Sequence, residues 1–368
     1  MNKYESRNIG MDMLRGIALF SVIGVHFFRS AGFYKEIISG PRMAVMVLMR
    51  SSFMVCVPLF LMLSGYLLNG KKLSAAYYLR IVRILFIYVV ASICCILYRI
   101  YIRKEGLSFS VAVLGLLNFS SAPYSWYIEM YIGLFLLIPF LNILYNGLSG
   151  RNQRKWLVAT LLILTAAPSV FNIFRISGLS WWAVPSSSKE YHKLVPQWWN
   201  SIYPITYYFL GCYIKENPLP IKKTTNFILI MLAFCFAGCF NYYRSYNSVF
   251  VDGAWATWGS ALITVQTVLV FSAFQKMDTQ KVPAGIKSMI VKISEWSLGA
   301  YLISWVFDDI IYTRLNAAVP IMRKRLAWFI LTVPVIFTAS VLVSALFSLL
   351  YHVTAEKIVR RIQNKLTA

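Results

Sequence analysis

Residues 10–29 read GMDMLRGIALFSVIGVHFFR, a run of 20 residues in which apolar side chains dominate. A helix of about 20 such residues rises about 30 Å, the thickness of the hydrocarbon core of a bilayer. The run nevertheless carries Asp12, Arg15 and His26, and ionisable groups inside a membrane are costly. No small-residue cleavage site follows His26, so the run is predicted to be a retained transmembrane helix and not a cleaved signal peptide.

The composition of the whole chain also indicates a membrane protein. Of its 368 residues, 59% are hydrophobic and 13% are charged, whereas a soluble domain has about 45–50% apolar and about 25% charged residues. These fractions exclude a soluble enzyme, a disordered chain and a disulfide scaffold. They favour an all-α integral membrane protein, with one transmembrane domain over residues 1–368 and no appended soluble domain.

Ten segments are long and apolar enough to cross a bilayer, so we expect a bundle of about ten transmembrane helices. Pro58 and Gly65 predict a kinked and tightly packed second span. Pro204 and Gly211 predict a broken or tilted sixth span. The apolar segment 107–119 is too short to cross and indicates a re-entrant, interfacial or soluble-side helix. The expected spans are 10–29, 43–68, 80–101, 124–146, 156–175, 199–215, 225–241, 255–275, 293–312 and 326–352.

The basic residues predict the orientation of the chain. An even number of spans places both termini on one side, where the terminal segments and breaks hold 20 Lys and Arg residues, against 14 in the breaks on the other side. Because cytoplasmic loops are enriched in Lys and Arg, both termini are predicted to be cytoplasmic. The net charge of +23 is explained by this topology and by attraction to anionic lipids. Without an RNA-binding or zinc-finger motif, no nucleic-acid partner is expected.

The six cysteines, at positions 56, 94, 95, 212, 235 and 239, all lie inside apolar runs. They form neither a loop framework nor a Cys-x-x-Cys pair. We therefore expect small buried hydrophobic side chains, with no disulfide and no metal site.

Arg15 and His26 are predicted to share one face of the first span. Eleven residues turn a helix through about 1100°, only about 20° from three full turns, and rise about 16 Å. Asp12 lies three residues before Arg15 and can pair with it, which would give both a structural role. An imidazole on an apolar helix is usually structural as well, but its alignment with a buried arginine favours a functional His26.

Arg80 and Arg83 open the third span, with Lys71 and Lys72 just before them. Guanidinium groups suit bidentate binding of phosphate. Basic side chains at the cytoplasmic edge of a span are also explained by snorkelling to the interface. The spacing alone leaves both interpretations open.

Ionisable residues are predicted to gather at two depths in the membrane. Glu129 enters with the fourth span from the side opposite the termini, which places it near the depth of His26. Two clusters on one buried path suggest that something crosses the bilayer or reacts across it. The expected inner cluster is Asp12, Arg15, Arg80 and Arg83, and the expected outer cluster is His26, Arg50, Glu129, Asp308 and Asp309.

These motifs resemble the membrane acyltransferase-3 family. Its members carry an Arg, ten residues and a His in the first span, as Arg15 and His26 do, and an Arg-x-x-Arg at the third span. Tyr124 and Ser304 depart from the family, because many members have His at both places, so this protein would do without those histidines or would use Glu129 and Asp308 instead. The further matches are Pro58–Tyr66 with a Pro-x-Phe…Ser-Gly-[Phe/Tyr] stretch, Tyr124–Leu141 with a His-x-Trp-Phe block, and Ser297–Ser304 with a Ser-Leu-Gly-x-Tyr-Leu-Ile-His block.

The resemblance implies a multi-pass O-acetyltransferase of a bacterial cytoplasmic membrane. It would move an acetyl group from cytoplasmic acetyl-CoA, its co-substrate, to a hydroxyl of a cell-surface polysaccharide or its lipid-linked precursor, without a metal. It would work alone, as a homo-oligomer or with a separate extracytoplasmic partner. The implied residues are His26, Arg15 and Glu129 for catalysis, Arg80, Arg83, Lys71 and Lys72 for acetyl-CoA, and Asp12, Arg50, Trp126, Ser304 and Asp308 for the acceptor.

A transporter or exporter of a polysaccharide unit or small solute remains the alternative. Ten spans with buried charges suit it equally well. Saturable binding of CoA that depends on Arg80 and Arg83 would distinguish the enzyme from the transporter.

Overall fold

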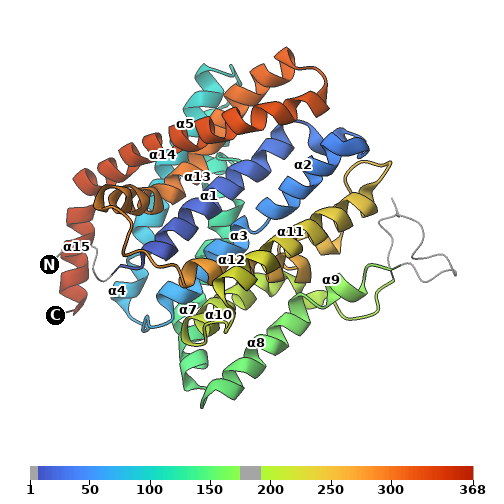
Figure 1. Cartoon of the computed structure of the whole chain (residues 1–368). Coiled ribbons are helices and arrows are strands. Elements are labelled where there is room, and N and C mark those ends of the chain that lie inside the picture. Colours follow the sequence, from blue (N-terminus) through green and yellow to red (C-terminus); the bar gives the residue numbers. More distant parts are fainter. Residues whose placement is uncertain (1–6, 175–191, 368) are drawn as a thin grey trace.

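The computed structural model describes residues 7–174 and 192–367, which form a helical bundle without β-strands, as predicted (Figure 1). Four short 3-10 helices join the α-helices: η1 (Phe33–Lys35), η2 (Trp198–Ile202), η3 (Ala254–Ala256) and η4 (Met322–Trp328). The α-helices are α1 (Ile9–Ser30), α2 (Gly40–Phe53), α3 (Cys56–Leu68), α4 (Ala75–Tyr78), α5 (Ile81–Tyr101), α6 (Phe109–Leu117), α7 (Trp126–Gly147), α8 (Arg151–Thr165), α9 (Pro168–Phe171), α10 (Tyr203–Glu216), α11 (Lys223–Ser245), α12 (Ala261–Gln275), α13 (Ala284–Ala318), α14 (Phe329–Thr354) and α15 (Glu356–Thr367).

Eight helical segments of the described chain are long and apolar enough to cross a membrane, fewer than the ten expected. The sixth expected span is α10, which has 14 residues and is too short to cross alone. The ninth is α13, which has 35 residues and carries charged side chains along its length. The eight segments are Ile9–Ser30, Gly40–Leu68, Ala75–Tyr101, Trp126–Gly147, Arg151–Phe171, Lys223–Ser245, Ala254–Gln275 and Met322–Thr354.

α1 runs through the middle of the bundle (Figure 1). It packs most extensively against α13 and also against α2, α3, α12 and α14. Leu14, Leu19, Ile23 and Phe27 of α1 are fully buried, which follows from the position of α1 between five other helices. The ionisable groups of α1 must therefore be accommodated inside the protein.

The second span is broken and tightly packed, as its Pro58 and Gly65 predict. The helix is interrupted at Met54–Val55, and Pro58 lies in the first turn of α3. A Cβ atom at Gly65 would lie 1.9 Å from the carbonyl oxygen of Tyr208, and one at Gly211 would lie 2.1 Å from that of Met62. The two glycines thus allow the backbones of α3 and α10 to touch.

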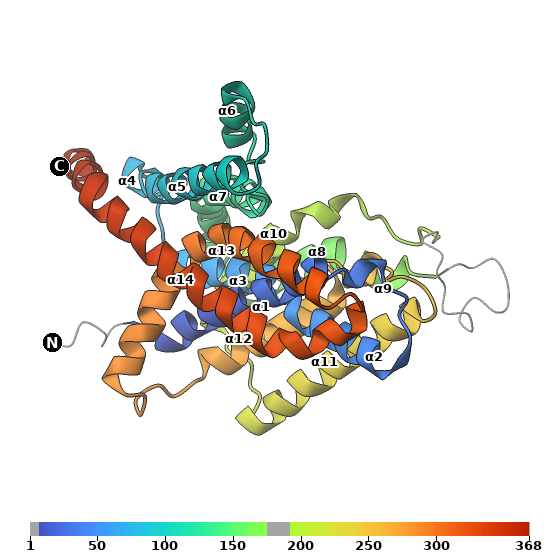
Figure 2. The same ribbon diagram turned by 90° about the horizontal axis from the view of Figure 1, so that it is seen from above.

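The start of α1 and the end of α15 lie at the same end of the bundle, here called the terminal end (Figure 1). The opposite end, where α1 finishes, is called the distal end. α6 has nine residues and projects from the bundle (Figure 2), which agrees with the prediction that 107–119 does not cross. All six cysteines are free, but Cys235 and Cys239 on α11 are exposed, so the expected burial is wrong for these two.

Candidate functional site

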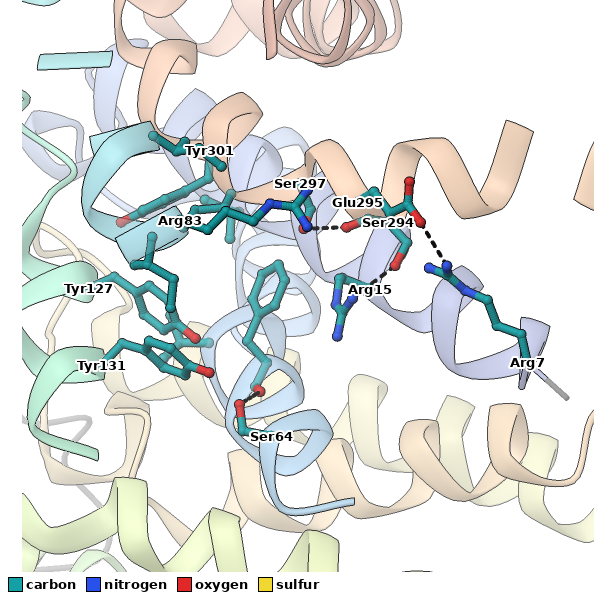
Figure 3. A pocket seen from close by; sticks show the side chains of 16 residues that line it. Arg7, Arg15, Ser64, Arg83, Tyr127, Tyr131, Ser294, Glu295, Ser297 and Tyr301 are labelled. Atoms are coloured by element: carbon teal, nitrogen blue, oxygen red, sulfur yellow. Dashed lines mark hydrogen bonds and ion pairs between the residues drawn. The ribbon is translucent and has the colours of Figure 1, made fainter. Parts of the chain in front are cut away.

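A cavity of about 440 Å³, the terminal cavity, opens beside the first half of α1. Figure 3 shows the guanidinium groups of Arg15 and Arg83 on one side of it and the hydroxyls of Tyr127 and Tyr131 on the other. Its walls are apolar except for these groups and a few others. The lining residues are Arg7, Arg15, Val22, Val57, Phe60, Ser64, Arg83, Ile84, Ile87, Tyr127, Tyr131, Ser294, Glu295, Ser297, Leu298 and Tyr301.

Arg15 is held in this wall by a serine of α13. Its Nη1 donates to Oγ of Ser294 at 3.0 Å, and that hydroxyl donates to Oδ1 of Asp12 at 2.5 Å. Asp12 is occupied by Arg7, whose Nε lies 2.7 Å from Oδ2 and whose Nη1 donates to Glu295 at 2.7 Å. The hydrogen bonds to Asp12 above all raise the pKa of Arg7. The predicted direct pair of Asp12 and Arg15 is therefore bridged by Ser294, which the sequence did not identify.

Of the four residues expected to bind CoA phosphates, Arg83 lines the terminal cavity and the other three do not. The guanidinium carbon of Arg83 lies 5.8 Å from the centre of the Tyr351 ring. Arg80 and Lys72 are exposed, and Lys71 is half-buried. Arg80 is the N-cap residue of α5, and a spacing of three residues separates it from Arg83 by about 60° around the helix axis.

A second cavity of about 450 Å³, the distal cavity, opens beside the last third of α1. His26, Arg50 and Trp126 line it, as expected of a site on the side opposite the termini. The full lining is Val22, Val25, His26, Arg29, Tyr34, Arg50, Met54, Cys56, Val57, Trp126, Asp252, Ala256, Thr257, Trp258 and Tyr301.

His26 is packed between an aromatic ring and a carboxylate. It is 8% exposed, and its imidazole stacks on the Tyr124 ring with 3.7 Å between centroids. Nδ1 of His26 lies 3.4 Å from Oδ2 of Asp308, which accepts a 2.6 Å hydrogen bond from the Tyr124 hydroxyl. Tyr301 in turn donates to the carbonyl oxygen of Tyr124 at 2.5 Å. With Nδ1 facing a carboxylate, Nε2 is left for a substrate.

Two other predicted residues lie away from this arrangement. Glu129 is exposed on α7, and its carboxylate forms no hydrogen bond or ion pair within the described ranges, so the carboxylate that faces His26 belongs to Asp308 and not to Glu129. Ser304 is buried, but its hydroxyl donates to the carbonyl oxygen of Tyr301 one turn earlier in α13. Tyr124, which replaces a family histidine, is instead part of the site.

The two cavities meet along α1. Val22, Val57 and Tyr301 line both of them. On α1, Val22 lies seven residues after Arg15 and four residues before His26. The guanidinium and the imidazole thus face two spaces separated only by a shared wall, and a group that passes this wall would move from the terminal side to the distal side.

A family model described as "Acyltransferase domain" (Acyl_transf_3) matches residues 8–350. No curated protein and no solved structure matches the chain. Over residues 7–174 and 192–367, no group of three or more His, Cys, Asp or Glu is placed to hold a metal ion. The matched range includes both cavities and every residue that lines them except Arg7.

Proposed function

The chain belongs to the membrane acyltransferase-3 family, and from this premise we propose that it is a membrane O-acetyltransferase. It takes acetyl-CoA from the cytoplasm at the terminal cavity and acetylates a hydroxyl of a surface carbohydrate at the distal cavity. The observation that carries this proposal is the pair of cavities that share Val22, Val57 and Tyr301. A cytoplasmic donor and an external acceptor require such a meeting point inside the bilayer.

The donor binds through the cations of the terminal cavity. Arg83 contacts a CoA phosphate from the cavity wall, and the exposed Arg80 and Lys72 reach phosphates outside it. The thioester arm extends along α1 past Arg15, which Ser294 holds in place. Arg15 binds and orients this arm on the terminal side, and the thioester itself lies beyond it, at the wall near Val22.

The acceptor hydroxyl binds at His26. Nε2 of the imidazole takes the hydroxyl proton as the oxygen forms a bond to the acetyl carbon, and the bond from that carbon to sulfur breaks. Coenzyme A leaves as the thiol after its thiolate takes up a proton. Asp308 and Tyr124 hold the imidazole in the orientation that this proton transfer needs. His26 lies about 16 Å along the helix from Arg15, so the acetyl end of the donor reaches the wall at Val22.

The family favours this enzyme over a transporter of a polysaccharide unit. A transporter needs no acyl donor, and it gives no reason for the guanidinium groups of Arg15 and Arg83 in a largely apolar cavity at the terminal end. Saturable CoA binding that weakens when Arg83 is replaced supports the enzyme. Its absence supports the transporter.

The test combines acetyl-CoA turnover by the purified protein with mass analysis of surface glycans from the cells that express it. Wild type transfers acetyl groups, and His26→Ala and Arg15→Ala each reduce transfer by at least about 100-fold. His352→Ala is the matched control, because His352 is exposed at the end of α14. Wild-type rates from both His26→Ala and Arg15→Ala would refute the proposal.

A further inference from the structure

Arg50 is a buried cation that the protein itself only partly satisfies. It is 3% exposed and lines the distal cavity. Its Nε donates to the Tyr34 hydroxyl at 3.2 Å, and its Nη2 donates to Oδ1 of Asp252 at 3.2 Å. Nη1 has no hydrogen-bond partner within the described residues. A buried guanidinium N–H without an acceptor is costly, so the site fits a ligand that supplies one.

The charges around the distal cavity favour an anionic ligand. Its ionisable lining consists of His26, Arg29, Arg50 and Asp252, plus the phenols of Tyr34 and Tyr301 and the thiol of Cys56. Arg29 is exposed, and its guanidinium forms no hydrogen bond or ion pair with the described part of the chain. The Asp252 side chain is 61% exposed, so solvent screens its charge. Two guanidinium groups and one screened carboxylate therefore line the cavity, while the buried carboxylate of Asp308 faces His26 and does not line it.

Aromatic rings form another part of the same wall. Trp126 and Trp258 stack with 4.6 Å between ring centroids and an angle of 14°, and both line the cavity with Tyr34. The C–H faces of a sugar ring pack well on aromatic side chains, and a few placed polar groups then fix its orientation. A lipid tail would leave Nη1 of Arg50 without an acceptor.

We propose that the acceptor bound in the distal cavity is a saccharide that carries an anionic group, a carboxylate or a phosphate, paired with Arg50. This inference rests on the proposed function, because it names the substrate class of the acceptor side. Arg50 and His26 line one cavity, so an anion at Arg50 positions the sugar while a hydroxyl of the same sugar reaches His26. The charged group thus selects the acceptor and is not itself modified.

The test measures binding without acetyl-CoA. Saturation-transfer NMR on the full-length protein in nanodiscs compares methyl β-D-glucuronide and glucose 6-phosphate with the neutral methyl β-D-glucoside. At least one charged probe binds wild type about tenfold or more tightly than the neutral probe. Arg50→Gln removes this preference, and Arg50→Lys restores part of it. Arg42→Gln, an exposed arginine of the same helix, keeps it.

A second variant tests the inference independently, in case Arg50→Gln does not fold. Asp252→Asn removes the carboxylate that competes for the guanidinium, at an exposed position, and is expected to tighten binding of the charged probe several-fold. Equal binding of charged and neutral probes by wild type, no binding of any probe, or an unchanged preference in folded Arg50→Gln overturns the inference. A preserved charge preference without any acetyl transfer would instead refute the acetyltransferase and leave the anion site standing.

Discussion

Asp308 lies with Oδ2 3.4 Å from Nδ1 of His26, across the contact between α13 and α1. The same oxygen accepts the Tyr124 hydroxyl, while Oδ1 of Asp308 has no partner within the described chain. Catalytic hydrogen bonds are often long before substrate binds. We infer that Asp308 is a positioning residue, which fixes the imidazole without touching the acceptor.

Asp308→Asn is expected to lower kcat for acetyl transfer about 10- to 100-fold, with little change in the KM for acetyl-CoA. The carboxylate orients the imidazole of His26 and an amide does so less well. Only the chemical step, and not the binding of acetyl-CoA, depends on the orientation of this imidazole. Steady-state kinetics in nanodiscs checks this, together with the pH dependence of kcat/KM, which a merely structural residue would not alter. Asp309→Asn is the control, because Asp309 pairs with Tyr98 and Arg103. Equal effects of the two substitutions would contradict the prediction.

Arg83→Gln is expected to raise the KM for acetyl-CoA about tenfold or more, and Arg80→Gln to raise it about threefold or less. Arg83 lines the terminal cavity, where its bond to a phosphate is little screened, whereas Arg80 is exposed. Binding of CoA measured by calorimetry gives a second readout. If both arginines contributed equally, the Arg-x-x-Arg pair would act as one surface unit and the cavity would not be the donor site.

The sequence was sufficient for geometry within one helix. Arg15 and His26 share a face of α1 because helix rotation fixes their relation, and both line the cavities. The break before Pro58 and the contact at Gly65 also follow from local chemistry. Such features depend on few neighbours, so a single sequence predicts them.

The partners of those side chains depend on how α13 packs, which a single sequence does not reveal. α13 runs parallel to α1 and brings Ser294 to Arg15 and Asp308 to His26. Depth in the membrane predicts Glu129 as the partner of His26, but Glu129 lies on a face of α7 that is exposed. The sequence did hold one sign of these partners. Ser294 and Asp308 are 14 residues apart, which is about four helical turns, so both lie close to one face of α13.

Gly65→Ala is expected to destabilise the bundle by about 1–3 kcal/mol. The new methyl group would start 1.9 Å from the carbonyl oxygen of Tyr208, so α3 and α10 must move apart. Gly133→Ala is the control, because nothing lies within 4 Å of a Cβ there and alanine favours a helix. The unfolding temperatures of the two variants are compared by heating each protein and measuring the remaining folded fraction by size-exclusion chromatography. Equal stability of the two variants would show that the backbones do not need this contact.

α15 is expected to loosen in acid. The side chain of Glu356 is hydrogen-bonded to His352 and to Arg360. These bonds, the one to His352 most of all, lower the pKa of Glu356 from its usual 4.5. A carboxylate with a lowered pKa stabilises the folded state above the usual value, and this contribution is lost as the pH falls through the lowered value. Hydrogen exchange of the α15 amides, corrected for intrinsic rates, checks this between pH 6 and pH 3. Glu356→Gln should abolish the pH effect, and its persistence would assign the loosening to another group.

Val22→Phe is expected to lower acetyl transfer at least about tenfold while the Kd for CoA stays within about threefold. Val22 is 4% exposed and belongs to both cavities, so a phenylalanine side chain there obstructs the wall that the cavities share, from a different helix than the one that carries Arg83. Val57→Phe blocks the same wall from α3 and tests the result independently. Val265→Phe, at a 53% exposed position of α12, controls for the added bulk. Because acetyl must pass this wall in the proposed reaction, full transfer by a correctly folded Val22→Phe protein would mean that donor and acceptor meet elsewhere.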